Sequence, residues 1–429
     1  MDTDRDGNWE LMFTTYGVMP RFIYIYELHL PNSWLVDSIP QPGANLLWDG
    51  GDFDVDGLYD LVLQFHFENP LADGIMVFES PDSFSFPTQE VWRDTVCPPQ
   101  VLPISAYDID QDDLPELVVN RAIPYGDIGI YEAIGADHYQ LIFADDPDTL
   151  HYDAPAATHA FGDFDEDGNV ECVFAGADDP YWIYECIGNN SYVKIAEGEL
   201  PTGNIRDCFS VADADGDGKL EFVLKGYRVS NARIEAYVFE AVGDNTYEVI
   251  KNFDLAGGSV YYWGGLSDAG DVDGDSVPEI LIEGCQTVYI VKAVGNDSFY
   301  VWETLPGHVD GSCVRVFDLD GNGLSEVIIS GNNETRIYEY EVGVAENTPS
   351  EIWTIGLSVS SNPFRDQTII KYFIQDPGHW MRSPTLRIYD VSGRLIRAFR
   401  LPPSSENQES SVTWYGDDDY GKVVPQGVY

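Results

Sequence analysis

The sequence predicts an all-β protein whose larger part is a seven-bladed β-propeller of four-stranded blades. Three observations support this prediction: an acidic nine-residue loop occurs seven times, its copies start 47 to 58 residues apart, and a short apolar run follows each copy. A repeat of about fifty residues is typical of propellers and solenoids. Because repeated four-stranded sheets close into a ring with only short exposed edges, we favour the propeller over a linear β-solenoid.

The loop at residues 163–171 shows the chemistry that the repeat can carry. Its carboxylates occupy positions 1, 3, 5 and 9 and its glycine occupies position 6. Alternate side chains of a tightly wound loop can direct oxygens to one point, and glycine adopts the positive φ that such a turn needs. Ca²⁺ takes roughly six to eight oxygen ligands in irregular geometry. Three monodentate aspartates, the backbone carbonyl of Asn169 and a bidentate Glu171 would supply them.

An EF-hand loop begins in the same way but ends with a glutamate at about position 12 and lies between helices. In this sequence the last carboxylate stands at position 9, and the run that follows it, Cys172-Val173-Phe174, is short and favours a strand. We therefore predict calcium loops between strands, with up to seven Ca²⁺ ions. Solvated acidic turns are the alternative.

The seven loops, numbered 1 to 7 in chain order, share side-chain ligands at positions 1, 3, 5 and 9 and a backbone carbonyl at position 7. The expected ligands are Asp2, Asp4, Asp6, Asn8 and Glu10; Asp52, Asp54, Asp56, Leu58 and Asp60; Asp108, Asp110, Asp112, Leu114 and Glu116; Asp163, Asp165, Asp167, Asn169 and Glu171; Asp213, Asp215, Asp217, Lys219 and Glu221; Asp271, Asp273, Asp275, Val277 and Glu279; and Asp318, Asp320, Asn322, Leu324 and Glu326.

The loops differ in ways that predict different affinities. Loops 3 and 6 carry Asp113 and Ser276 at the glycine position, so these residues must adopt a left-handed conformation. Loop 7 replaces one carboxylate by Asn322 and should bind more weakly. We expect loops 2, 4 and 5 to bind most tightly. Affinity should fall as the pH approaches the ordinary carboxylate pKa of about 4.

The strands follow in a fixed order within each repeat. A short strand precedes each loop, for example 313–317, and an apolar strand such as 117–119 follows it. A third strand ends in a recurring segment at 130–135, 183–188 and 238–243. Hairpin residues come next, and an aromatic residue then starts the outer strand (Tyr139, Tyr192, Tyr247 and Phe299). Each repeat is therefore expected to be a four-stranded antiparallel sheet with its loop between the first two strands.

These loops resemble the FG-GAP/VCBS repeats of integrin-α-type propellers. The segments Gly51-Asp-Phe-Asp54 and Gly162-Asp-Phe-Asp165 are close matches to the start of that motif. The resemblance covers residues 1–345, in which the first blade is expected to be incomplete. It implies a seven-bladed propeller with calcium in its loops, usually extracellular.

The pattern then stops. Residues 346–354 are polar, contain proline and are expected to form a linker. Residues 355–429 show a different strand pattern that fits a small antiparallel sandwich. They resemble the immunoglobulin-like C-terminal modules of the flagellar hook-capping protein and of type IX secretion sorting tails, with the last strand missing. The resemblance implies export or surface attachment through secretion machinery. We expect a fragment, because no signal peptide precedes the first loop.

Composition and missing motifs narrow the function. A net charge of −52 argues against nucleic acid as a partner, and no apolar run is long enough to insert into a membrane. The six cysteines show no zinc spacing, although Cys172 and Cys186 could either pair across a hairpin or remain free thiols. The histidines show no metal-pair spacing, and His151 and His159 are expected to be structural or solvent-exposed. We found neither a nucleophile elbow nor a phosphate loop.

We therefore expect a secreted or cell-surface, non-enzymatic binding or adhesion scaffold, with a protein or glycan ligand on a loop face. The alternative is a calcium-supported carbohydrate-active enzyme or polysaccharide-binding module.

Overall fold

The computed structural model forms two compact units, Met1–Ser325 with Ile329–Asn333, and Glu326–Ile328 with Glu334–Tyr429. All elements of the described residues are β-strands. The structure describes residues 3, 5, 9–14, 21–29, 33–41, 44–66, 73–94, 104–120, 128–146, 158–176, 180–201, 205–228, 233–256, 265–284, 286–308, 312–319, 322–331, 334–340, 354–360, 367–375, 385–389, 395–400, 410–417 and 422–424.

The larger unit contains five four-stranded antiparallel sheets in which consecutive strands are neighbours. Their strands are β4 (Ala44–Gly51), β5 (Asp60–His66), β6 (Asp73–Glu79) and β7 (Gln89–Asp94); β8 (Ile104–Tyr107), β9 (Glu116–Asn120), β10 (Ile128–Ala133) and β11 (Tyr139–Asp145); β12 (Ala160–Gly162), β13 (Glu171–Ala175), β14 (Pro180–Cys186) and β15 (Tyr192–Glu199); β16 (Ile205–Val211), β17 (Glu221–Arg228), β18 (Arg233–Gly243) and β19 (Thr246–Ala256); and β20 (Asp268–Gly270), β21 (Glu279–Glu283), β22 (Thr287–Ala293) and β23 (Phe299–Pro306). In each of them a predicted calcium loop joins the first two strands.

A three-stranded sheet stands at each end of this series. The first comprises β1 (Glu10–Thr14), β2 (Arg21–His29) and β3 (Ser33–Gln41), and the last comprises β24 (Cys313–Phe317), β25 (Glu326–Gly331) and β26 (Glu334–Tyr338). The chain between β24 and β26 is divided between the two units. We therefore do not count this last sheet as a blade of the larger unit. The β1–β3 sheet and the five four-stranded sheets are its six blades, numbered 1 to 6 in chain order.

The prediction of seven four-stranded blades is thus wrong in number. The loop motif occurs seven times, but a complete blade also needs one strand before the loop and three strands after it. Within the described residues, the first sheet has no strand before its loop and the last sheet has no fourth strand. Counting loops therefore overestimates the number of complete blades.

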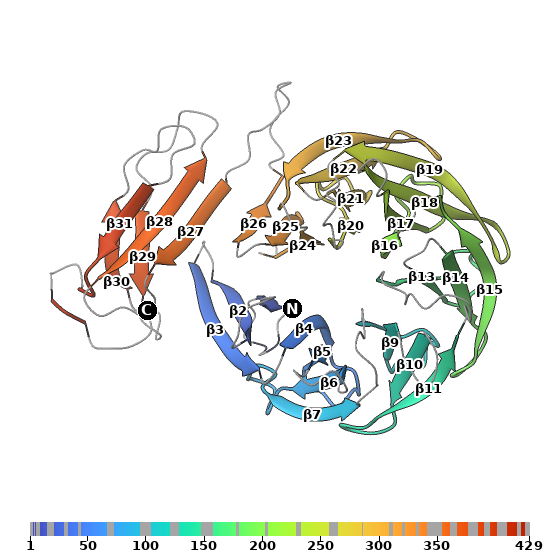
Figure 1. The fold of residues 1–429 in the computed structure, drawn as a ribbon, viewed down its shortest axis with the longest axis horizontal. Helices are drawn as coiled ribbons and strands as arrows, with labels where there is room; N and C mark the ends of the chain where they lie inside the picture. Colours follow the sequence, from blue (N-terminus) through green and yellow to red (C-terminus); the bar gives the residue numbers. More distant parts are fainter. Residues whose placement is uncertain are drawn as a thin grey trace. The chain divides into compact units, whose positions relative to one another are not determined.

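The blades surround a central axis, with the outer strands β7, β11, β15, β19 and β23 at the perimeter (Figure 1). The hydrophobic cores lie between neighbouring blades. In β9, Leu117 and Val119 pack against blade 2, whereas Val118 packs against blade 4. Because both faces of these strands are buried, their sequences are continuously apolar instead of alternating.

Hydrogen bonds also connect the innermost strands of adjacent blades. Asp49 in β4 accepts the N–H of Ala106 in β8 at 2.9 Å. The hydroxyl of Ser210 in β16 accepts the N–H of Phe161 at 2.7 Å and donates to the carbonyl of the same residue at 2.8 Å. Side chains thus continue the bonding from one sheet to the next where no backbone pairing is available.

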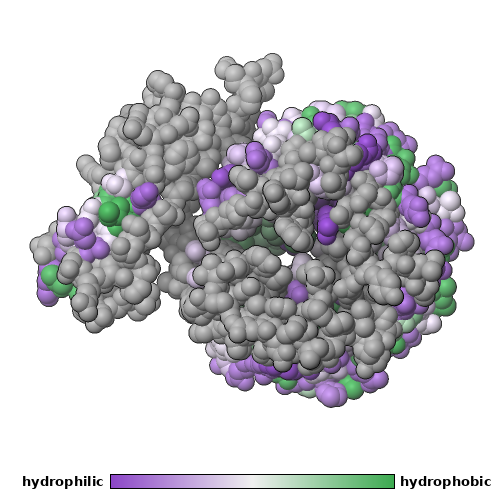
Figure 2. Space-filling model, in the orientation of Figure 1, coloured by the Kyte–Doolittle hydropathy of each residue, from purple (hydrophilic) through white to green (hydrophobic). Residues whose placement is uncertain are grey.

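The perimeter carries mainly hydrophilic side chains with scattered hydrophobic ones (Figure 2). Val193 in β15, Val249 in β19 and Tyr300 in β23 are exposed examples from outer strands. Single apolar residues of this kind are ordinary on a soluble surface.

The smaller unit contains two antiparallel sheets, β27-β28-β31 and β29-β30. Side chains from four of its strands share one core, formed by Ile370, Ile388, Ile396 and Trp414. Its strands are β27 (Thr354–Ser360), β28 (Thr368–Gln375), β29 (Thr385–Tyr389), β30 (Leu395–Arg400) and β31 (Ser410–Trp414). The predicted linker at 346–354 lies outside the described residues, except for Thr354.

Two sequence-based questions are answered by the described residues. No helix in them is both long and apolar enough to span a membrane. Cys172, Cys186, Cys208 and Cys313 are free thiols, so Cys172 and Cys186 do not pair.

The interblade cores generate the first prediction. Phe164 is fully buried at position 2 of loop 4 and contacts the ring of Phe222 in the next blade at 5.0 Å between centroids. Replacing Phe164 by Ala should lower the free energy of unfolding by about 3–5 kcal/mol, measured by chemical denaturation with Ca²⁺ present. The control is Phe84→Ala, because Phe84 is 77% exposed and its loss should cost less than about 0.5 kcal/mol. Equal losses in the two variants would contradict an interblade core at Phe164.

Candidate metal sites

Each of the loops 2 to 6 contains two residues in the left-handed region, at positions 4 and 6. Asp113 and Ser276 adopt φ of 74° and 69°, which confirms the prediction made for loops 3 and 6. The left-handed residue at position 4 was not predicted. In loop 2 it is Val55, at φ 58°, a conformation that is strained for a β-branched side chain.

Hydrogen bonds from the backbone to the first and fifth side chains hold this conformation. The position-1 carboxylate accepts the N–H of residue 6 at 2.8–3.1 Å in loops 2 to 7. The position-5 side chain accepts the N–H of residue 7 at 2.7–3.0 Å in the same loops. Aspartate and asparagine are suited to these turns because their short side chains reach backbone N–H groups two or more residues ahead.

The position-9 carboxylate closes the loop from the start of the following strand. One of its oxygens accepts the N–H of residue 2 at 2.6–3.0 Å in loops 1 to 6. In loops 3, 4 and 5 the other oxygen, Oε1 of Glu116, Glu171 and Glu221, is buried and has no hydrogen-bond partner. One oxygen is thus bound to the backbone, which favours monodentate coordination of a metal by Oε1 over the bidentate coordination that we predicted.

Loop 4 brings its predicted side-chain ligands together. Oxygens of Asp163, Asp165, Asp167 and Glu171 lie within 4.8 Å of one another. Three of the oxygens, Asp163 Oδ1, Asp165 Oδ1 and Glu171 Oε1, are buried without hydrogen-bond partners. Buried oxygens without donors are costly, and a hard cation such as Ca²⁺ would satisfy all three at once. The residues present therefore fit the ion.

The other loops reproduce this arrangement to different extents. Loop 5 gathers Asp213, Asp215, Asp217 and Glu221; loop 2 gathers Asp52, Asp54 and Asp56; and loop 3 gathers Asp108, Asp110 and Glu116. In loop 7, Asp318 and Asn322 keep the turn bonds described above, but Asp320 lies outside the described residues. In loop 1, Asp2, Asp4, Asp6 and Asn8 also lie outside them, and Glu10 is buried.

In loop 6 a lysine lies where the other loops would hold a metal ion. Lys292 in β22 forms ion pairs with Asp273, with Asp275 at 3.3 Å and with Glu279 at 3.2 Å. Burial alone would lower the pKa of Lys292, but its bond to Asp273 and the charge of Glu279 raise that pKa. The ammonium group neutralises these carboxylates, which argues against the calcium ion predicted for loop 6.

The position-9 carboxylates have raised pKa values in the protein. Burial, reinforced by the acidic neighbours, raises the pKa of Glu116, Glu171 and Glu221 to about 8. Burial likewise raises the pKa of Asp60 to about 7. Protons should therefore compete with a metal ion well above the pH of about 4 that the sequence suggested.

Loops 2 to 5 are also attached to the next blade. The position-3 carboxylates of loops 2 to 5 accept backbone N–H groups at 2.6–2.8 Å from residues in the following blade. The donors are Asp137, Asn190, Asn245 and Asp297, all in hairpin turns between third and fourth strands and all with φ between 54° and 59°. Sequence reasoning recognised these turns as hairpins but not as contacts of the loops. Their common signal is an Asp or Asn two residues after a glycine.

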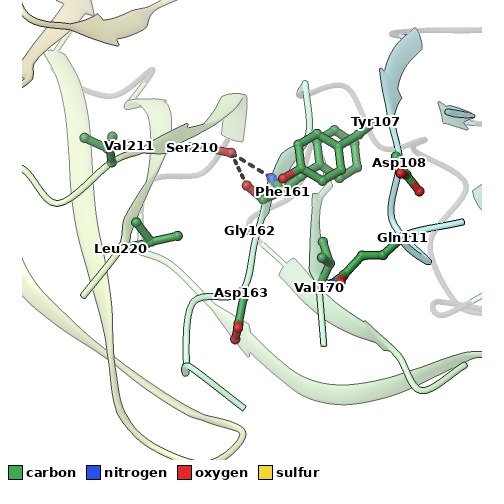
Figure 3. Close-up of a pocket in the computed structure, with 11 residues that line it drawn as sticks. Tyr107, Asp108, Gln111, Phe161, Gly162, Asp163, Val170, Ser210, Val211 and Leu220 are labelled. Atoms are coloured by element: carbon green, nitrogen blue, oxygen red, sulfur yellow. Dashed lines mark hydrogen bonds between the residues drawn. The ribbon is translucent and has the colours of Figure 1, made fainter. Parts of the chain in front are cut away.

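A shallow pocket lies between loops 3 and 4 (Figure 3). It encloses about 480 Å³ and is lined by Asp108, Gln111 and Asp163 among other residues. The rings of Tyr107 and Phe161 stack in it with a centroid distance of 5.0 Å and an interplanar angle of 7°. Tyr107 is 40% exposed, so this stack presents an aromatic surface beside two of the acidic loops.

One of the two histidines considered from the sequence is in the described residues. His159 is buried, and its ring nitrogens lie 2.9 Å from the hydroxyl of Ser105 and 3.0 Å from the amide oxygen of Asn120. Burial lowers the pKa of His159 to about 3, so the ring is neutral near pH 7. It contributes to packing between blades 3 and 4, in agreement with a structural role. His151 lies outside the described residues.

Comparison with protein families agrees with a propeller built from FG-GAP-like repeats. The family model of the FG-GAP-like repeat matches residues 163–224, which contain loops 4 and 5. No curated protein matches the chain. An Agrocybe aegerita lectin described as recognising non-reducing terminal N-acetylglucosamine is 15% identical, with a TM-score of 0.47, covering 76% of this chain and 86% of the lectin. The WD40 domain of Toxoplasma gondii coronin is 8% identical, with a TM-score of 0.49, covering 76% of this chain and 77% of that domain. Likenesses at this level identify neither a function nor a ligand.

The raised pKa values generate a second prediction. Without divalent cations, the melting temperature should fall as the pH rises from about 5 to about 8. The folded state retains protons on Glu116, Glu171 and Glu221 up to a pKa of about 8, whereas the unfolded chain releases them near its ordinary value of about 4.3. The folded state then binds more protons in this window, so a rising pH favours unfolding.

The measurement is a series of thermal melts in EDTA across this pH range. Saturating Ca²⁺ should remove the decline, because the ion takes the place of the protons. A melting temperature in EDTA that rises throughout the window would show that these carboxylates are not held in proton-retaining sites.

Proposed function

We propose that this chain is a secreted or cell-surface calcium-binding β-propeller that acts as a non-enzymatic binding or adhesion scaffold. The observation that carries the proposal is the convergence of four carboxylates in loops 4 and 5, with buried oxygens that have no hydrogen-bond donor. Loops 2 and 3 show related clusters. Loop 6 is excepted because of Lys292, so the proposal covers up to six ions.

Calcium has a structural role in this proposal. In loop 4 the ion would bind carboxylates that are already attached to the backbone of the loop and, through Asp165, to the turn at Asn245 in the next blade. It would thereby fix the loop and the interblade contact together. The protein oxygens surround the proposed ion position, and the catalytic motifs sought in the sequence were not found, so the ion supports binding surfaces instead of chemistry.

The smaller unit would serve as an immunoglobulin-like module for export or surface attachment, engaged by secretion machinery. Its two antiparallel sheets with a common core support this assignment. Deleting residues 355–429 should leave a folded propeller that stays inside the producing cell. Undiminished delivery of the truncated chain to the surface would refute the assignment.

The pocket at Tyr107 supports a second candidate function, a polysaccharide-binding or carbohydrate-active protein. Exposed aromatic rings can stack on sugar rings, and this one lies beside two acidic loops. A glycan array with product analysis separates the candidates. Under this second function, Tyr107→Ala should abolish a glycan signal, with exposed Tyr300→Ala as the control. Cleavage of any glycan would rule out the non-enzymatic scaffold, and the absence of any signal would rule out the second function.

The third prediction tests calcium binding directly. Glu171→Gln keeps the size of the side chain but removes its charge, so the variant should bind one Ca²⁺ fewer by isothermal titration calorimetry. It should also lose part of the rise in melting temperature that Ca²⁺ produces over EDTA. Mg²⁺ should produce less of that rise, because it demands a smaller and more regular site.

The matched control is Glu166→Gln in the same loop. Glu166 is exposed at position 4 and is not an expected ligand, so this variant should keep the full number of ions. If calcium raises the melting temperature of neither the native chain nor its variants, the loops are solvated acidic turns and the proposal fails.

A further inference from the structure

A second acidic cluster lies beside loop 2, at the contact between blades 2 and 3. It consists of Asp54 at position 3 of the loop, Glu79 at the end of β6, and Asp137 in the β10–β11 turn. One carboxylate oxygen from each residue lies within 4.8 Å of the others. The N–H of Asp137 donates to Asp54 Oδ2 at 2.6 Å, so the backbone holds two of the three groups together. We call this cluster joint 2/3.

Glu79 is buried among acidic groups, and the side-chain hydrogen bond that it makes is with Asp137. Its side chain is 7% exposed, and its Oε1 atom is buried without a hydrogen-bond partner. After burial itself, the influences that raise its pKa to about 8 come from Asp137, Asp56 and Asp60, all of them acidic. A buried carboxylate among like charges calls for a positive partner.

The other joints have the same architecture, and they show which groups bind the corresponding glutamate elsewhere in the chain. At the joint between blades 3 and 4, the turn residue is the neutral Asn190, whose side chain bonds to Glu132. At the joint between blades 4 and 5, the side chains of Asn245 and Asn169 both form hydrogen bonds with the carboxylate of Glu185. The bond from Asn169 measures 3.2 Å. At both joints the strand glutamate thus receives an amide donor, although its Oε2 atom remains without a hydrogen-bond partner.

The joint between blades 5 and 6 is the closest counterpart of joint 2/3. It has three equivalent carboxylates, Asp215, Glu240 and Asp297, but Lys219 forms an ion pair with Glu240 there. Lys219 stands at position 7 of loop 5, and loop 2 has Leu58 at that position. Where the acidic trio recurs, the chain supplies its own cation, and at joint 2/3 the side chain that would do so is apolar.

We propose that joint 2/3 binds a divalent cation of its own through Asp54, Glu79 and Asp137, in addition to the ion of loop 2. The three carboxylates are hard oxygen ligands suited to Ca²⁺ or Mn²⁺, and water completes the shell. Asp54 belongs to both sites. The ion takes the place that Lys219 fills between blades 5 and 6, and it connects the turn of blade 3 to the edge of blade 2. This site goes beyond the calcium loops and does not require loops 3 to 5 to be occupied.

The test compares Asp137→Asn with Asp297→Asn in the full-length chain. Asparagine already occupies this turn position in two other blades at φ 54° and 55°, so both variants should fold. Tightly bound Ca²⁺ per chain is counted by elemental analysis after desalting. Asp137→Asn should lose one ion, whereas Asp297→Asn should lose none, because Lys219 neutralises that joint. Equal counts in the native chain and the Asp137→Asn variant would overturn the proposal and favour a proton shared by Glu79 and Asp137.

Anomalous diffraction from crystals soaked in Mn²⁺ then locates the ion. The native chain should show a peak between the three carboxylates of joint 2/3, which Asp137→Asn and Glu79→Gln both remove while the loop 2 peak remains. A peak in loop 2 with none at the joint overturns this inference and leaves the loop sites intact. If the loops hold no ion, Glu171→Gln will be without effect, so failure of the calcium-loop proposal is seen separately.

Discussion

The propeller depends on the neutralisation of carboxylates that are buried between its blades. Every complete repeat places an acidic residue at position 9 of its loop and a glutamate or lysine opposite it on the third strand, both enclosed by neighbouring sheets. Backbone N–H groups satisfy one oxygen of each position-9 group, and the second oxygen needs a positive partner, because an uncompensated buried charge costs several kcal/mol. In loop 6 that partner is Lys292, which lies 3.2 Å from Glu279. In loops 3, 4 and 5 the second oxygen has no hydrogen-bond partner, and a bound cation would satisfy it there.

The loops also explain how local metal binding would affect the whole ring. Position 2 of each loop, occupied by Phe53, Ile109 and Phe164 in loops 2 to 4, is buried in an interblade core. In loops 2 to 5, position 3 accepts a hydrogen bond from the next blade, so such a loop also releases two contacts outside itself when it loses its turn. Cation binding to the loops would therefore contribute to the folding free energy of the propeller, because the unfolded chain has no such pre-arranged oxygens.

The loops and most of their conformations could be predicted from the sequence, because they depend on residues that are close together along the chain. The nine-residue spacing predicted the loops. The absence of glycine at position 6 of loops 3 and 6 predicted that Asp113 and Ser276 adopt a left-handed conformation. The left-handed Val55 could not be predicted, because valine disfavours that conformation and is held there by surrounding bonds. Lys292 and Glu79 were missed for a different reason. They lie 13 and 19 residues beyond the position-9 groups of their loops, and only the pairing of second and third strands brings them to the carboxylates. The number of blades was overestimated because the loop motif is present even where a sheet lacks a strand.

The distribution of lysines divides the propeller into two kinds of joint. Lys219, Lys225 and Lys292 all belong to blades 5 and 6, where they form ion pairs with acidic groups of the loops and of the contact between these blades. In the described residues of blades 2 and 3, the carboxylates of the loops and of the facing third strands receive hydrogen bonds from backbone N–H groups, from the Tyr139 hydroxyl and from the side chains of Asn189 and Asn190. A net charge of −52 attracts cations from solution to the chain. Under the proposed function, dependence on divalent ions should therefore extend over blades 2 to 5, in which a glutamate stands opposite the position-9 group. Blade 6, whose loop holds Lys292, should then be the blade least affected by loss of calcium.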